Sequence, residues 1–119
     1  MPSPVEPIDD DDLLWRRIHS DHWIPDTDGV YGPSSAAFID PSMSVDAARL
    51  VQSGDYHETM HRDAGGVAVA QFSAGYARHT HGQVVAHDPQ PDNVAHSLVT
   101  GNKPRKMARE WRTASTILT

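Results

Sequence analysis

Histidine is the residue type in this sequence with the most varied chemistry, and eight of the 119 residues are histidines. The segment His57-Glu58-Thr59-Met60-His61 matches the pattern H-E-x-x-H. On a helix, this spacing places two imidazoles one turn apart, where they bind zinc while the glutamate acts as general base on a metal-bound water. The motif therefore makes His57 and His61 candidate metal ligands and Glu58 a candidate catalytic residue.

The surroundings of this motif favour a simpler interpretation. Gly54-Asp55 precedes it and Asp63-Ala64-Gly65-Gly66 follows it, so the predicted helix is short and polar. The sequence offers several third ligands and selects none of them: His79, His81, His87 and His96. We therefore expect that the protein has no cofactor. If the motif is functional, we expect that it binds zinc. The alternative is a surface helix whose two histidines face water.

His87 and His96 form a second candidate site. Gln83 to His87 and Asn93 to Val99 are predicted strands, and the Pro-rich segment 88–92 between them favours a hairpin with a wide loop. This pairing would bring the two histidines together as general acid and base for phosphodiester cleavage, or as ligands of one metal. The structural alternative is a pair of half-buried histidines bonded to backbone carbonyls.

A third candidate is a binding site for an anion. Arg17 and His19 lie at the end of a predicted strand that starts at Leu13, and Ser34 and Ser35 lie in the loop region that follows. The alternative is that these charged groups are solvated, or paired with the acidic residues at 9–12. The two serines lack the G-x-S-x-G context of serine hydrolases.

Charge is divided unevenly along the chain. The net charge is −6, with thirteen acids and four arginines in residues 1–63 but three acids and six bases in residues 64–119. Contact with nucleic acid is therefore restricted to one basic cluster, with Trp111 available for stacking on bases. That cluster is Lys103, Arg105, Lys106, Arg109 and Arg112. The apolar spacing of Met107, Trp111, Ala114 and Leu118 instead predicts a helix that docks on the sheet or on a partner.

The elements that must position these residues indicate a small α+β domain. Val67 to Phe72 is the clearest strand, because its β-branched residues and the glycines that flank it both favour a strand. Ala36 to Ile39 is predicted as another strand, and Ser44 as the cap of a helix that runs to Val51. We expect a mainly antiparallel sheet with two to four helices, including the amphipathic C-terminal helix. Residues 13–119 form this single domain, and residues 1–12 form a disordered acidic arm.

The composition limits the classes of function. There is no cysteine, which excludes disulfide scaffolds and thiol nucleophiles. No apolar run reaches the ~20 residues that span a bilayer, and the acidic opening is unlike a signal peptide, so we expect a cytoplasmic protein that does not enter membranes. Leu, Ile, Val and Phe number only 22, which predicts a thin core and help from a protein partner or from homo-oligomerisation.

Four segments of the sequence form a recognisable succession: Leu14-Trp15-Arg16-Arg17-Ile18-His19, Gly32-Pro33-Ser34-Ser35-Ala36-Ala37-Phe38, Ser44-Val45-Asp46 and Asp92-Asn93-Val94-Ala95-His96. In these segments the chain resembles a group of small uncharacterised bacterial proteins that have no assigned activity. The resemblance implies a shared polar cluster of Arg17, His19, Ser34, Ser35 and His96. It supplies no activity.

Two hypotheses therefore come from the sequence. The first is a small non-catalytic module that binds a protein partner as an accessory part of a bacterial complex. The alternative is a small histidine-dependent hydrolase or nuclease, with metal if His57 and His61 bind one.

Overall fold

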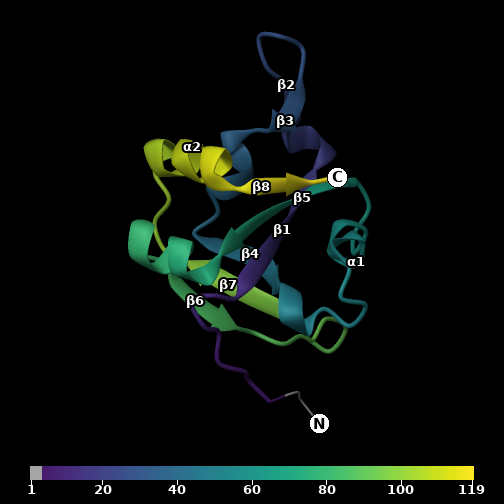
Figure 1. Cartoon of the computed structure of the whole chain (residues 1–119), viewed down its shortest axis with the longest axis vertical. Helices are drawn as coiled ribbons and strands as arrows, with labels where there is room; N and C mark the ends of the chain where they lie inside the picture. Colours follow the sequence, from purple (N-terminus) through teal and green to yellow (C-terminus); the bar gives the residue numbers. More distant parts are fainter. Residues whose placement is uncertain (1–3) are drawn as a thin grey trace.

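The framework of the computed structural model is a six-stranded antiparallel sheet with the strand order β6-β7-β4-β1-β5-β8 (Figure 1). The structure describes residues 4–119. The strands of the sheet are β1 (Leu13–His19), β4 (Ser42–Ala47), β5 (Gly66–Ser73), β6 (Val84–His87), β7 (His96–Thr100) and β8 (Thr116–Leu118). A separate two-stranded hairpin consists of β2 (Trp23–Pro25) and β3 (Tyr31–Pro33).

Helical segments connect these strands. The α-helices are α1 (Tyr56–Met60) and α2 (Arg105–Ala114), and η4 (Tyr76–Thr80) is π-helical. The 3-10 turns are η1 (Ser20–His22), η2 (Ser35–Phe38) and η3 (Ala48–Leu50). The expectation of a small α+β domain with a mainly antiparallel sheet is confirmed. Within residues 4–119, every helix is too short or too polar to cross a membrane.

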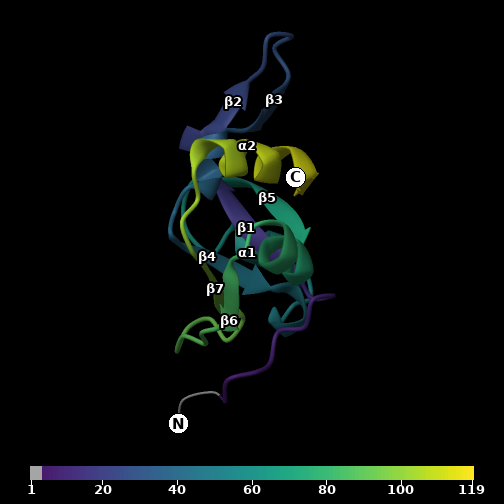
Figure 2. The same cartoon turned by 90° about the vertical axis from the view of Figure 1, so that its left-hand side faces the viewer.

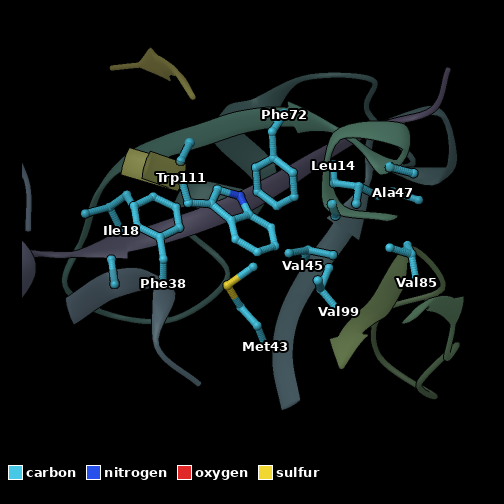
Figure 3. Close-up of a cluster of buried hydrophobic side chains, with 14 of the residues drawn as sticks. Leu14, Ile18, Phe38, Met43, Val45, Ala47, Phe72, Val85, Val99 and Trp111 are labelled. Carbon is cyan, nitrogen blue, oxygen red and sulfur yellow. The ribbon is translucent and has the colours of Figure 1, made fainter. Parts of the chain in front are cut away.

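The main core lies on the face of the sheet that α2 and η2 cover. Trp111 of α2 is fully buried there, stacked 6.4 Å from the ring of Phe38 and edge-on to Phe72 at 5.1 Å (Figure 3). The strands contribute further buried apolar side chains to this face: Leu14, Ile18, Met43, Val45, Ala70 and Val99. Alternation along each strand sends the intervening side chains to the other face.

A smaller apolar cluster lies on that other face, under α1. It consists of Trp15, Val51, Met60, Val69 and Ala95. Because α1 is only five residues long, it covers only part of the sheet. The remainder of this face is where the polar residues of β1, β4 and β7 gather.

Two predicted elements differ from the structure. Ser42–Ala47 is a strand and not a helix, because Met43, Val45 and Ala47 alternate into the core with a period of two residues. Ala36 and Ala37 belong to a 3-10 turn and not to a strand, since the hydroxyl of Ser34 accepts the N–H of Ala36 and its carbonyl accepts the N–H of Ala37. In contrast, the strand over 67–72 is confirmed, and so is the hairpin after Gln83, although its second strand begins at His96 and not at Asn93.

The C-terminal segment also departs from its predicted course. Helix α2 ends at Ala114, where the N–H and hydroxyl of Ser115 both donate to the carbonyl of Trp111. The chain then forms β8 beside β5, with Leu118 opposite Val69. Leu118, which the helical spacing placed on the apolar stripe of the helix, is therefore a strand residue on the second face of the sheet.

Residues 4–12 of the predicted acidic arm lie along the domain. Ile8 is buried, and the carbonyls of Asp10 and Asp12 accept the N–H groups of Gly75 and Ala74, each at 2.9 Å. Two of the arm's aspartates have arginine partners, since Asp10 lies 3.0 Å from Arg78 and Asp12 lies 3.0 Å from Arg49. The first three residues of the predicted arm lie outside the described residues.

Candidate functional site

An open polar pocket of about 480 Å³ lies on the second face of the sheet, beside α1. Its residues come from several elements that are distant in sequence. Its lining includes Arg17 and His19 from β1, His22 from η1, Ser44 and Asp46 from β4, Thr59 from α1, Arg62 and Asp63 from the turn after α1, and Asn93 and His96 from the β6–β7 hairpin.

The pocket forms where β1 and β4 separate. These strands pair only at Leu14 with Ala47 and at Trp15 with Asp46. Beyond that point the guanidinium of Arg16 takes the place of a strand partner, because its Nη1 donates to the carbonyl of Ser44 at 2.9 Å and its Nε to that of Ala37 at 3.2 Å. Burial lowers the pKa of Arg16 from its ordinary value. The opening in the sheet is thus held by a half-buried cation.

Asp46 is the buried centre of the pocket wall. Its Oδ2 accepts the hydroxyl of Thr59 at 2.7 Å and Nη2 of Arg62 at 2.7 Å, and its Oδ1 accepts Nδ2 of Asn93 at 2.8 Å. One carboxylate therefore joins α1, the turn after α1 and the β6–β7 loop to the centre of the sheet. These bonds satisfy an anion that would be costly to bury alone.

Arg17 points along the pocket floor towards β5. Its Nη1 donates to Asp63 at 2.8 Å, a carboxylate whose side chain is 71% exposed, while its buried Nε has no hydrogen-bond partner. A Cβ at Gly66 would collide with the carbonyl of Met60 and lie 2.9 Å from Cδ of Arg17. Glycine at this position therefore makes room for the arginine stem.

His96 contacts two groups of the pocket rim. Its Nδ1 lies 2.9 Å from the carbonyl oxygen of Asp88 and 3.2 Å from Oδ2 of the same residue. Its Nε2 lies 3.2 Å from Oγ of Ser44, which is exposed on β4. The arrangement is a serine hydroxyl, an imidazole and a carboxylate in a row.

The structure does not bring His87 to His96. His87 pairs with Ser97 across the hairpin and points to the core face, whereas His96 points to the pocket face. The Nδ1 of His87 accepts the N–H of Glu6 at 2.8 Å and its Nε2 donates to the carbonyl of Val94 at 2.6 Å. Both nitrogens of this buried ring are therefore bonded to backbone.

The H-E-x-x-H segment lies on α1 and its C-terminal cap, and His57, Glu58 and His61 are outside the pocket, although Thr59 of the same segment lines it. His57 and His61 are exposed, with ring centroids 6.2 Å apart, and Nδ1 of His57 lies 2.8 Å from Asp55. Hydrogen bonds from the backbone N–H and the ring of His57 lower the pKa of Asp55. Glu58 accepts the N–H of Ser53 at 3.2 Å and lies 3.4 Å from Arg62. Over residues 4–119 there is no cluster of three or more His, Cys, Asp or Glu side chains placed to hold a metal.

The C-terminal basic cluster is divided in the structure. Arg105, Lys106, Arg109 and Arg112 are exposed on α2. Lys103 is buried, and its Nζ donates to the carbonyls of Val99 at 2.8 Å and Gly101 at 3.2 Å. Trp111 is buried in the core, so it does not offer a surface for stacking on bases.

Three of the five residues implied by the resemblance meet in the pocket, namely Arg17, His19 and His96. Ser34 and Ser35 do not, because Ser34 caps the 3-10 turn that Ser35 begins. Sequence analysis missed Ser44, Asp46 and Asn93 as site residues. The alternation Met43-Ser44-Val45-Asp46 carries a signal for two of them, since a strand over these residues places both polar side chains on one face.

The fold and the site define a small α+β domain with a polar pocket at an opening in its antiparallel sheet. Comparison of the chain with protein-family models, curated proteins and solved structures finds no match.

Removal of the Asp46 carboxylate is predicted to destabilise the protein strongly. Asp46→Ala removes the acceptor of the Asn93 amide and leaves the guanidinium of Arg62 with only the 3.4 Å contact to Glu58, and breaking such a buried pair costs about 3–5 kcal/mol. Urea unfolding measures this loss. Asp63→Ala is the matched control, because it removes an exposed ion pair worth at most about 1 kcal/mol. Equal losses in both variants would contradict the central role of Asp46.

The protonation of Lys103 predicts a pH dependence of stability. Burial lowers its pKa from 10.5 to about 8. Between these values the unfolded chain keeps a proton that the folded chain has released, so the free energy of unfolding rises with pH across this window. Nuclear magnetic resonance (NMR) of the two lysine side chains should show a midpoint near 8, assigned by its absence from Lys103→Met. That variant should also lack the rise in stability, and an unshifted lysine midpoint would contradict the prediction.

Proposed function

We propose that this chain is a small binding module that takes an anionic group of a protein partner into the pocket beside α1. The observation that carries the proposal is the state of Arg17. Its side chain is 31% exposed, and its guanidinium has an exposed carboxylate as its one hydrogen-bond partner among residues 4–119 and a buried Nε–H without an acceptor. A buried donor left unpaired costs about 1–3 kcal/mol, which a ligand oxygen would recover.

A carboxylate or phosphate is the ligand chemistry that suits this group. Guanidinium presents donors in a planar fork that matches two oxygens of one anion. After a small rotation of the side chain that releases Nη1 from the exposed Asp63, a ligand anion can bond Nε and Nη2, whose N–H groups lie parallel on one edge of the guanidinium. His19 and His22 line the same pocket and add donors beside Arg17.

The other cations of the pocket are already committed. Arg62 is neutralised by Asp46, and Arg16 donates to backbone carbonyls. These bonds fix the pocket walls. Arg17 is therefore the cation that remains for a ligand, and its exposed partner Asp63 is weakly held because exposed ion pairs contribute little.

The hairpin of β2 and β3 supports a protein as the carrier of the anion. It projects beyond the end of the domain (Figures 1 and 2). Three large apolar side chains are exposed on it, with exposed fractions of 44% for Ile24, 64% for Val30 and 58% for Tyr31. β2 begins directly after His22 of the pocket, so a protein seated on the hairpin reaches the pocket rim.

The pocket is tested by NMR titration with succinate and, in a second arm, with inorganic phosphate. The Nε–H resonance of Arg17 should move downfield as it gains an acceptor, and whichever anion moves it identifies the ligand class. Arg17→Gln should abolish saturable binding, while Arg105→Gln on the exposed face of α2 should leave it unchanged. An Arg17 resonance that neither anion moves would overturn the proposal.

The partner surface is tested by light scattering and by affinity capture. The unmodified chain is expected either to self-associate or to retain one partner in stoichiometric amount. Replacing Ile24, Val30 and Tyr31 with serine should remove that association without lowering the free energy of unfolding, because all three are exposed. A lone monomer that retains no stoichiometric partner would count against a binding module.

A further inference from the structure

We infer that Ser44 is an activated nucleophile for acyl transfer from an ester, with His96 as its general base and Asp88 as the group that orients the imidazole. The three groups come from separate elements: the strand β4, the strand β7 and the loop after β6. The hydroxyl of Ser44 is within hydrogen-bond reach of the base, at 3.2 Å from Oγ to Nε2 of His96. Asp88 holds the other side of the ring, with its backbone carbonyl bonded to Nδ1 at 2.9 Å and its carboxylate Oδ2 in an ion-pair contact with Nδ1 at 3.2 Å. A nucleophile bonded to a base that a third group orients is the recognised pattern of covalent catalysis.

The backbone carbonyl of Asp88 determines which nitrogen of the His96 imidazole carries the proton. The carbonyl oxygen of Asp88, 2.9 Å from Nδ1 of His96, can only accept a hydrogen bond. The neutral imidazole therefore carries its proton on Nδ1, which leaves the lone pair of Nε2 directed at the hydroxyl of Ser44. Ser44 Oγ–H is then the donor of the 3.2 Å contact, as proton abstraction requires.

The hydroxyl is also accessible and firmly placed. Ser44 is exposed and lines the 480 Å³ pocket, so an ester carbonyl can approach Oγ. Its backbone is fixed on one side by the bond from Arg16 to the Ser44 carbonyl and on the other by pairing with Leu98 of β7. The nucleophile thus stands on a rigid strand and not on a loop.

The reaction proceeds by two balanced steps. Oγ of Ser44 attacks the acyl carbon while its proton passes to Nε2 of His96, and the ester C–O bond breaks as the leaving alkoxide takes that proton. This gives an acyl-serine and a free alcohol. Water then attacks the acyl-serine with His96 again as base, which releases a carboxylic acid and restores the hydroxyl. No oxidant, reductant or metal takes part in either step.

The substrate class follows from the other groups in the pocket. Arg17 lies in the same pocket as Ser44, so an ester that carries a carboxylate on its acyl part is the substrate class that the pocket favours. This choice of substrate rests on the proposed function. The nucleophile does not, because it depends only on Ser44, His96 and Asp88.

A neutral fluorophosphonate probe tests the nucleophile alone. The unmodified chain should form a phosphonyl-serine with loss of fluoride, and peptide mapping by mass spectrometry should place it at Ser44. Ser44→Ala should abolish the adduct, and His96→Gln should slow it by roughly 10²-fold or more. Ser42→Ala is the matched control, since Ser42 is exposed on the same strand and lies outside the pocket lining. It should label at the normal rate.

Ester hydrolysis separates the nucleophile from the anion site. Ser44→Ala should remove turnover of both p-nitrophenyl acetate and the mono-p-nitrophenyl ester of succinate. Arg17→Gln should reduce turnover of the succinate ester alone, through a higher KM. A chain that neither labels at Ser44 nor loses hydrolysis in Ser44→Ala overturns the nucleophile. Equal turnover of both esters, unaffected by Arg17→Gln, would overturn the anion site and leave the nucleophile standing.

Discussion

The buried carboxylate of Asp46 is the constraint on which the second face of the sheet depends. It lies beneath the pocket and accepts hydrogen bonds from Thr59, Arg62 and Asn93, which belong to three different segments. Because α1 is too short to be stable by its own backbone bonds, its position must come from tertiary contacts such as the one to Thr59. Asp46 also holds Asn93, whose side chain accepts the N–H of Ala95 directly before His96. The same anion therefore positions the helix beside the pocket and the loop that leads to the candidate base.

The opening between β1 and β4 shows how a sheet can provide a pocket without a cleft between domains. Strand pairing normally uses every backbone donor and acceptor, so a separation of two strands leaves carbonyls to be satisfied by other groups. Arg16, which is half-buried, supplies two such donors, to the carbonyls of Ser44 and Ala37. The guanidinium of Arg16 therefore has a structural role. Arg17, the next residue, lies on the opposite side of the strand and does not have this role. Adjacent arginines thus have separate roles because the strand alternates.

Sequence reasoning predicted the elements whose signal is local. Val67 to Phe72 is apolar on both faces and flanked by glycine, and the loop 88–92 has two prolines, so β5 and the β6–β7 hairpin were predicted correctly. It failed at Ser42–Ala47, where Val45, Ala48 and Val51 also fit a helical spacing and tertiary pairing with β1 and β7 decides the outcome. That one error concealed the site, because a serine interpreted as a helix cap is not sought as a nucleophile. His96 and Arg17 were recognised as candidates from their residue types, but their partners Ser44 and Asp63 are 52 and 46 residues away along the chain.

Aromatic side chains compensate for the small number of large aliphatic residues in the main core. Trp111, Phe38 and Phe72 fill the centre of the main core with aromatic volume, and alanines of β5 pack beneath them. The described part of the chain thus fills its main core from few large side chains. Of the large apolar residues that stay exposed, Ile24, Val30 and Tyr31 lie together on the hairpin, and the others are spread over the domain. These three residues form the surface on which the proposed partner would sit. A partner held there would cover one rim of the pocket and exclude water from it. Hydrogen bonds of Arg17 and of His96 strengthen when water is removed. Binding of the proposed partner would therefore favour the proposed reaction in this pocket.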